Sequence, residues 1–343
     1  MSRSFAIHRE GGGKNKLMSD VNLIHPSSVA RAAYQSVVGV LSGAEYRLLG
    51  FILATLAGIF VNQAVRHQAV DWGQFFPVVG VSLELALIGA FLRKTGRFPR
   101  LAMGTVGLGL YVCFSSCSAI FIFTLFPFVN PMIDQQLIAL DAAFGFSWIG
   151  FVEYVANYPK IGLALRHIYL TILPQLGFLI VLLSYLRREV VLHRFLTVGF
   201  VGMILTDTLW WLFPSVGPAA YGMVSIDAQT NILLVANAAY GAEMRSLATE
   251  GLALITPQRI TGVVAFPSFH IVLTCLVLWF ARGTLAFVPL VILNIPMPVA
   301  TVVHGGHHLV DLVGGIIVFV VSLKVGTWLV PEILAANTAS EPN

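Results

Sequence analysis

Long apolar runs separated by short polar segments dominate the chain from about residue 47 onward. A run of about 18 residues lets a helix cross a hydrocarbon core of roughly 30 Å. About eight runs reach or approach this length, and the sixth is short. They cover approximately 47–65, 75–92, 101–127, 163–186, 195–213, 267–281, 284–303 and 308–330. The pattern predicts an all-α fold, a polytopic transmembrane helical bundle of about eight spans.

Composition and charge support an integral membrane protein. Hydrophobic residues make up 57% of the chain and charged residues only 10%, against roughly one quarter charged in soluble domains. With the N-terminus inside, most Lys and Arg fall in cytoplasmic segments, which predicts that both termini are cytoplasmic. The expected location is a bacterial inner membrane. The net charge of +4 needs no nucleic-acid partner to explain it.

Two of the segments expected outside are too long to be simple turns. Residues 128–162 mix acidic and bulky apolar side chains, which is typical of helices that lie in the membrane interface. Residues 214–266 carry Arg245 and Arg259 close to a histidine-rich region. We expect the second segment to gate a substrate site.

Histidines open two of the late spans, and ionisable residues at membrane depth are candidates for function. His270 follows Pro267 and Ser268 at the start of the sixth span. A proline suits a helix start, and Ser268 is expected to cap the helix. The free amides of that start would form an anion site, so we expect Ser268 to contribute to phosphate binding.

His307 and Asp311 stand four residues apart at the entrance of the last span. On a helix this spacing places both on one face, where the carboxylate can orient the imidazole and raise its basicity. His308 lies about 100° around the helix and is expected to be a polar interfacial residue. The sixth and eighth spans both run inward, so His270 and His307 share one membrane face. Two such histidines suit double displacement, in which one attacks phosphorus and the other protonates the leaving oxygen.

These segments carry a family resemblance. Residues 266–270 (Phe-Pro-Ser-Phe-His) resemble the PSxH signature of the type 2 phosphatidic acid phosphatase superfamily, and residues 307–311 (His-His-Leu-Val-Asp) resemble the HxxxD core of its third signature. The resemblance implies that His307 is a nucleophile forming a phosphohistidine, that Asp311 orients it, and that His270 is the acid for the leaving group. It also implies no metal and no cofactor, and a lipid phosphoester as substrate.

The resemblance covers about residues 101–330 and implies a six-helix catalytic core there. The rest of the chain then divides into a cytoplasmic tail at 1–45, two extra transmembrane helices at 46–100 and a cytoplasmic tail at 331–343. The catalytic site would face the periplasm.

The chain also departs from the superfamily pattern. Ala300 and Thr301 stand where the third signature begins with Ser-Arg, and the first signature, KxxxxxxRP, is absent near 206–218. It resembles instead the branch of inositol phosphorylceramide synthases and sphingomyelin synthases, which moves a phosphorylated head group between lipids. The segment 259–265 is similar to that of bacterial proteins with an inositolphosphotransferase-like domain. We expect Arg259 and Arg245 to replace the missing phosphate ligands.

Two other functions stay open. A metal-dependent membrane hydrolase would use histidine and aspartate ligands from the same region. A transporter, the non-enzymatic alternative, would relay protons through Glu84 and Asp207, which sit in or near apolar spans.

Overall fold

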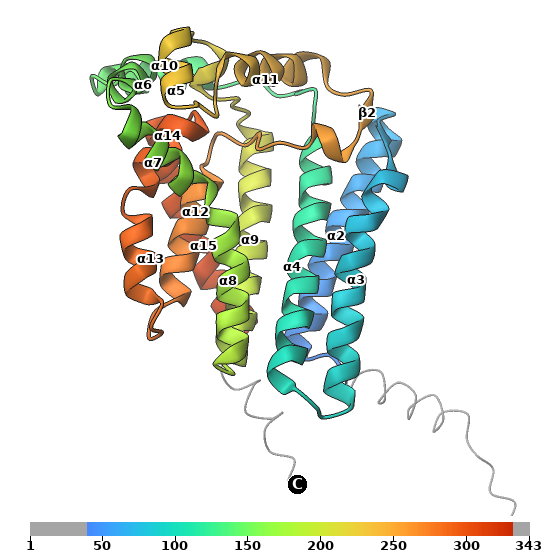
Figure 1. Cartoon of the computed structure of the whole chain (residues 1–343). Helices are drawn as coiled ribbons and strands as arrows, with labels where there is room; N and C mark the ends of the chain where they lie inside the picture. The colour runs from blue at the N-terminus through green and yellow to red at the C-terminus, as the bar shows by residue number, and fades with distance from the viewer. Residues whose placement is uncertain (1–39, 332–343) are drawn as a thin grey trace, which may run out of the picture. The chain divides into compact units, whose positions relative to one another are not determined.

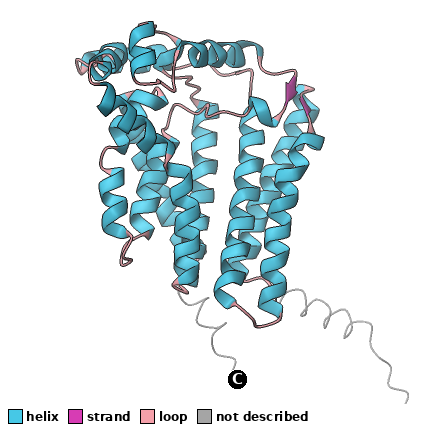
Figure 2. Cartoon of the chain, in the orientation of Figure 1, coloured by secondary structure: helices cyan, strands magenta, loops and turns pink. Residues whose placement is uncertain are grey.

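The computed structural model describes residues 40–331. Within that range it contains fourteen α-helices and one parallel pair of two-residue strands, β1 (Ala69–Val70) and β2 (Leu254–Ile255) (Figure 2). The prediction of an all-α polytopic bundle is confirmed. The predicted tails at 1–45 and 331–343 lie almost wholly outside the described residues.

Five helices are long and apolar enough to cross a membrane. They are α2 (Gly43–Arg66), α3 (Trp72–Lys94), α4 (Pro99–Phe123), α9 (Glu189–Leu212) and α15 (Leu309–Leu329) (Figure 1). These correspond to the first, second, third, fifth and eighth predicted spans. The chain is therefore an integral membrane protein.

The fourth and seventh predicted spans are broken helices. The fourth divides into α7 (Pro159–Leu170) and α8 (Ile172–Tyr185), bent by 45°, and the seventh into α13 (Phe287–Asn294) and α14 (Met297–Gly305), bent by 43°. Pro296 stands between α13 and α14, where its missing N–H removes a helical hydrogen bond. The sixth span, α12 (Phe269–Phe280), has only 12 residues.

The two long segments expected outside, residues 128–162 and 214–266, contribute a layer of short helices at one end of the bundle (Figure 1). They contain α5 (Asp134–Ala143), α6 (Trp148–Ala156), α10 (Ile226–Asn231) and α11 (Ala238–Glu250), with single 3-10 turns at Pro218–Ala220 and Pro257–Arg259. Backbone hydrogen bonds join the segments, from Phe128 N–H to Ala248 O and from Ile133 N–H to Pro214 O, at 3.0 and 2.9 Å. Residues far apart in the sequence thus share one layer.

Positively charged loops meet at the opposite end. The Arg100 guanidinium lies 4.9 Å from the centre of the Tyr185 ring, which joins the start of α4 to the end of α8. Arg188 donates to the carbonyls of Arg282 and Gly283, which joins the α8–α9 and α12–α13 loops. This charge asymmetry is the one on which the predicted sidedness depends.

Candidate active site

The segment between α14 and α15 carries the predicted nucleophile. Helix α14 ends at Gly305, Gly306 adopts a left-handed conformation (φ +62°), and His308 is the N-cap of α15. The Asp311 Oδ2 atom lies 3.2 Å from His307 Nδ1 and accepts the His308 N–H at 2.8 Å. The predicted His307–Asp311 pair therefore exists, but not on one helix face. His307 precedes the helix, and Asp311 reaches back to it from the first turn of α15.

The start of α12 lies directly beside this segment. The Ser268 N–H donates to the Asp311 carbonyl at 2.9 Å, and Ser268 Oγ lies 3.4 Å from His307 Nε2. Ser268 occupies the N-cap position, yet its side chain makes no capping hydrogen bond. The expected cap is therefore wrong, because the hydroxyl is directed to His307 instead.

His270 stacks on Tyr169, with ring centres 4.2 Å apart and planes inclined by 14°. Its ring centre lies 6.4 Å from that of His307, at 64°. The structure thus brings His307, Asp311, His270 and Ser268 together from two helix starts separated by a third span. The stacking of Tyr169 from α7 on the second histidine had no counterpart among the sequence-based expectations.

Both histidines line a cavity of about 450 Å³ that extends into the bundle. His270, His307, Gly305, Tyr169 and Tyr240 contribute to its lining near the site. The rest is mostly apolar, with contributions from α4, α8, α9 and α12 that include Phe114, Ile122, Leu176, Leu196, Phe200 and Leu276. On α4 alone the lining runs from Tyr111 to Phe123, about 18 Å along the helix axis.

Burial affects the chemistry of the proposed nucleophile. The His307 side chain is almost completely buried, and this burial lowers the pKa of its imidazole to about 4, while a backbone hydrogen bond with Ala265 acts in the opposite direction. The ring is therefore neutral at neutral pH. A neutral imidazole keeps the lone pair that nucleophilic attack requires.

The two predicted phosphate-binding arginines lie outside the cavity lining in the described part of the chain. Arg259 Nη2 is 3.5 Å from Glu243 Oε1, and the Arg259 side chain is half exposed. Arg245 donates to the Ala220 carbonyl. Arg259 nevertheless immediately precedes the loop 260–264, which does line the cavity, and both arginines stay predictions as phosphate ligands.

His308 differs from its expected role as a polar interfacial residue. It is 1% exposed, and its Nδ1 lies 2.8 Å from Asp141 Oδ2 on α5. A second carboxylate–histidine pair therefore stands beside the first. This contact was not predicted from the sequence, because Asp141 and His308 are 167 residues apart in the chain.

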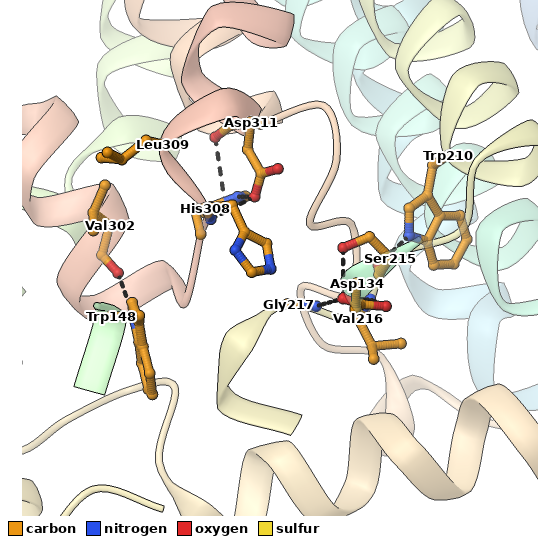
Figure 3. Close-up of polar contacts among 12 residues, drawn as sticks. Asp134, Trp148, Trp210, Ser215, Val216, Gly217, Val302, His308, Leu309 and Asp311 are labelled. Atoms are coloured by element: carbon orange, nitrogen blue, oxygen red, sulfur yellow. Dashed lines mark hydrogen bonds and ion pairs between the residues drawn. The ribbon is translucent and has the colours of Figure 1, made fainter. Parts of the chain in front are cut away.

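Asp134, the other acidic residue of α5, organises the loop after α9. It accepts hydrogen bonds from Ser215 Oγ at 2.8 Å and from the Val216 and Gly217 amides at 3.0 and 2.9 Å (Figure 3). Burial and the Asp134 carboxylate raise the pKa of Tyr221 to about 12, so its phenol stays protonated and donates to Asp134 at 3.3 Å. The predicted interfacial segment thus orders the loop at Gly217, which packs against Gly306 beside the site.

Among the described residues, no group of three or more His, Cys, Asp and Glu side chains is arranged to hold a metal ion. Asp207, which the transporter alternative used, is buried on α9, and its Oδ1 has no hydrogen-bond partner.

A family model described as the PAP2 superfamily matches residues 135–325, more than half of the chain. The matched range contains every predicted site residue. Comparisons with curated proteins and with solved structures gave no match.

Proposed function

Since the chain belongs to the PAP2 superfamily, which supports a phosphatase or phosphotransferase function on lipid phosphoesters, we propose that it works through a phosphohistidine on His307. The observation that carries the proposal is the cavity with both histidines beside apolar walls. A phosphoester at the histidines can thus place its hydrocarbon part against side chains that exclude water. The predicted core at 101–330 and the two extra helices at 46–100 stay part of this proposal.

In the first step, His307 Nε2 attacks phosphorus and the bond from phosphorus to the leaving oxygen breaks. The negative charge of the bound phosphoester favours the protonated form of His270, which gives its proton to that oxygen, so the alcohol leaves uncharged. Asp311, beside Nδ1, holds the ring orientation and stabilises the imidazolium that forms. The Ser268 hydroxyl, next to Nε2, is placed to donate to a phosphoryl oxygen as negative charge develops.

In the second step, the oxygen of a hydroxyl group attacks phosphorus, the bond from phosphorus to His307 Nε2 breaks and leaves the imidazole neutral again, and His270 takes up the proton of the hydroxyl group. The acceptor is water in hydrolysis and a second alcohol in transfer. We propose transfer, in line with the inositolphosphotransferase-like branch. Its support is the deep burial of His307, because a site closed to bulk water favours an acceptor that is itself bound. We further propose that this end of the bundle faces the periplasm, since the opposite end gathers the positive loops.

The test uses purified protein and a lipid phosphoester labelled at phosphorus. Wild-type protein should form a protein-bound label that is stable to base and labile to acid, as a phosphoramidate is. His307→Ala should abolish this label and turnover while remaining folded. His167→Ala is the matched control, because His167 is an exposed histidine on α7, and it should behave as wild type.

Two further measurements separate the alternatives. Turnover should resist a chelator and be inhibited by vanadate, whereas a metal-dependent hydrolase loses activity to the chelator. Comparing membrane lipids with and without the gene identifies the donor that accumulates and the product that disappears. A protein-bound label that still forms in the His307→Ala variant would show that His307 is not the nucleophile.

A further inference from the structure

The Asp141–His308 pair lies beside the proposed nucleophile and takes no part in the chemistry derived above. We propose that Asp141 and His308 are positioning residues that hold the turn at residues 306–308, which connects α14 to α15 and carries His307. The inference rests on the proposed function, because the turn matters for catalysis only if His307 is the nucleophile. It assigns a catalytic purpose to α5, a helix outside the bundle.

Asp141 uses both carboxylate oxygens on this turn. Its Oδ2 atom is 2.8 Å from His308 Nδ1, and its Oδ1 atom accepts the Leu309 N–H at 3.2 Å. The Leu309 amide belongs to the first residue of α15, one of the helix-start donors that lack a partner within the helix. The Asp141 side chain, from a helix distant in the sequence, thus caps α15 and also binds the imidazole ring of His308.

The contacts form a chain that ends at the nucleophile. Asp141 holds the His308 ring, the His308 backbone N–H donates to Asp311 Oδ2, and the same oxygen lies beside His307 Nδ1. A shift of His308 therefore moves the carboxylate contact that orients His307. A displacement of about 1 Å at a reacting group costs up to roughly 100-fold in rate.

Helix α5 also supports the turn indirectly, through the loop at Val216 and Gly217. Asp134 and Asp141 lie about two helical turns apart on α5, and Asp134 holds the Val216 and Gly217 amides. Gly217 packs so closely on the turn that an added Cβ would lie 2.4 Å from the Gly306 carbonyl oxygen. The two carboxylates thus fix both the turn and the loop packed against it.

The His308 ring does not line the cavity that holds His307. It lines a separate cavity of about 210 Å³, together with Asp141, Trp148 and Tyr221. His308 Nε2 is buried and has no hydrogen-bond partner. A ring that faces away from the substrate cavity acts through its neighbours, which distinguishes this pair from His307 and Asp311.

The experiment compares His308→Ala with His308→Asn. The asparagine amide can place a donor near the position of Nδ1, facing Asp141, but has no equivalent of Nε2. We expect His308→Ala and Asp141→Asn to lose about 10- to 100-fold in kcat with KM nearly unchanged, and His308→Asn to recover most of the loss. The double variant His308→Ala/Asp141→Asn should be no worse than either single one.

The matched control is Glu153→Gln. Glu153 on α6 also accepts a hydrogen bond from a backbone amide, that of Ser225 at 2.6 Å, and its hydrogen bonds go to Ser225 rather than to the turn, so its variant should keep wild-type kcat. Wild-type kcat in folded His308→Ala overturns the proposal. So does a His308→Asn variant as impaired as His308→Ala, because Nε2 would then be the functional atom.

Hydrogen exchange of the segment 304–311 gives a readout independent of turnover. Asp141→Asn should speed exchange of the Leu309 amide, and His308→Asn should leave it close to wild type. Unchanged exchange in Asp141→Asn overturns the proposal even if no lipid is turned over. Turnover by wild-type protein without a His307-bound label would contradict the proposed function and with it the effect on kcat, whereas the exchange of the Leu309 amide would still show whether Asp141 holds the turn.

Discussion

Gly305, the last residue of α14, is the position where a single methyl group should disturb the nucleophile most directly. In Gly305→Ala the new Cβ would lie 2.7 Å from His307 Cδ2, 3.1 Å from Tyr169 Cε2 and 3.3 Å from His307 Nε2. Carbon atoms pack best at about 3.5 to 4.0 Å, so the His307 ring must move by about 1 Å. The residue that gives way is the one whose position catalysis requires.

The size of the effect follows from two estimates. Overpacking a buried site costs about 1 to 3 kcal/mol, equivalent to roughly 5- to 150-fold in rate. A shift of 1 Å in a reacting group costs up to about 100-fold. We therefore expect kcat to fall about 10- to 100-fold. The loss of folding stability should be smaller than the overpacking cost of about 1 to 3 kcal/mol, because alanine in a helix gains about 0.5 to 1 kcal/mol over glycine.

The assay is the initial rate of lipid phosphoester turnover by protein that elutes as a single folded species, with vanadate affinity measured in parallel. Gly104→Ala is the matched control, since its added Cβ would meet Ser184 at 3.5 Å, an ordinary contact. It should retain wild-type turnover. Wild-type kcat in Gly305→Ala would refute the reasoning, because it would show that His307 tolerates displacement or is not the attacking group.

Three further predictions concern charged groups, two of them at the site and one in the loops that set the orientation in the membrane. Asp311→Asn should lower kcat by roughly 10² to 10⁴, through loss of the carboxylate that orients the imidazole; a smaller fall seen in single-turnover rates would count against that role. Arg259→Lys should lose most turnover, because an ammonium cannot bind two phosphate oxygens in the same geometry, and Arg245→Ala should lose less; wild-type vanadate affinity in Arg259→Ala would remove this arginine from the site. A reporter fused after Asn343 should be cytoplasmic and a tag near Ala228 accessible from outside; an external C-terminus would reverse the proposed orientation.

The membrane spans were predictable because their signal is local. A run of apolar residues predicts a spanning helix without knowledge of its neighbours, and each predicted span corresponds to a helix or a bent pair. The bends were not predicted, although Pro296 was visible in the sequence. Run length alone does not distinguish a straight helix from two helices that share one apolar stretch.

The two carboxylate–histidine pairs differ in how far apart their members stand in the sequence. His307 and Asp311 are four residues apart, so their contact was predicted, although the helical geometry assumed for it was wrong. The local reasoning failed one residue later, at His308. There a helical phase angle indicated an interfacial side chain, whereas a carboxylate from another part of the chain keeps the ring buried.

The contacts of the two α5 carboxylates could not be predicted from the sequence. Asp141 and His308 are 167 residues apart, and Asp134 and Ser215 are 81 apart. In a single sequence both aspartates have the spacing of polar residues on an interfacial helix, which predicts exposure to water or lipid head groups. Only the folded chain places them against the turn and the loop, where buried carboxylates without these partners would be costly. The cost of burying them there is therefore evidence that α5 belongs to the site, and it makes α5 the first place to look for variants that change turnover without touching a proposed catalytic residue.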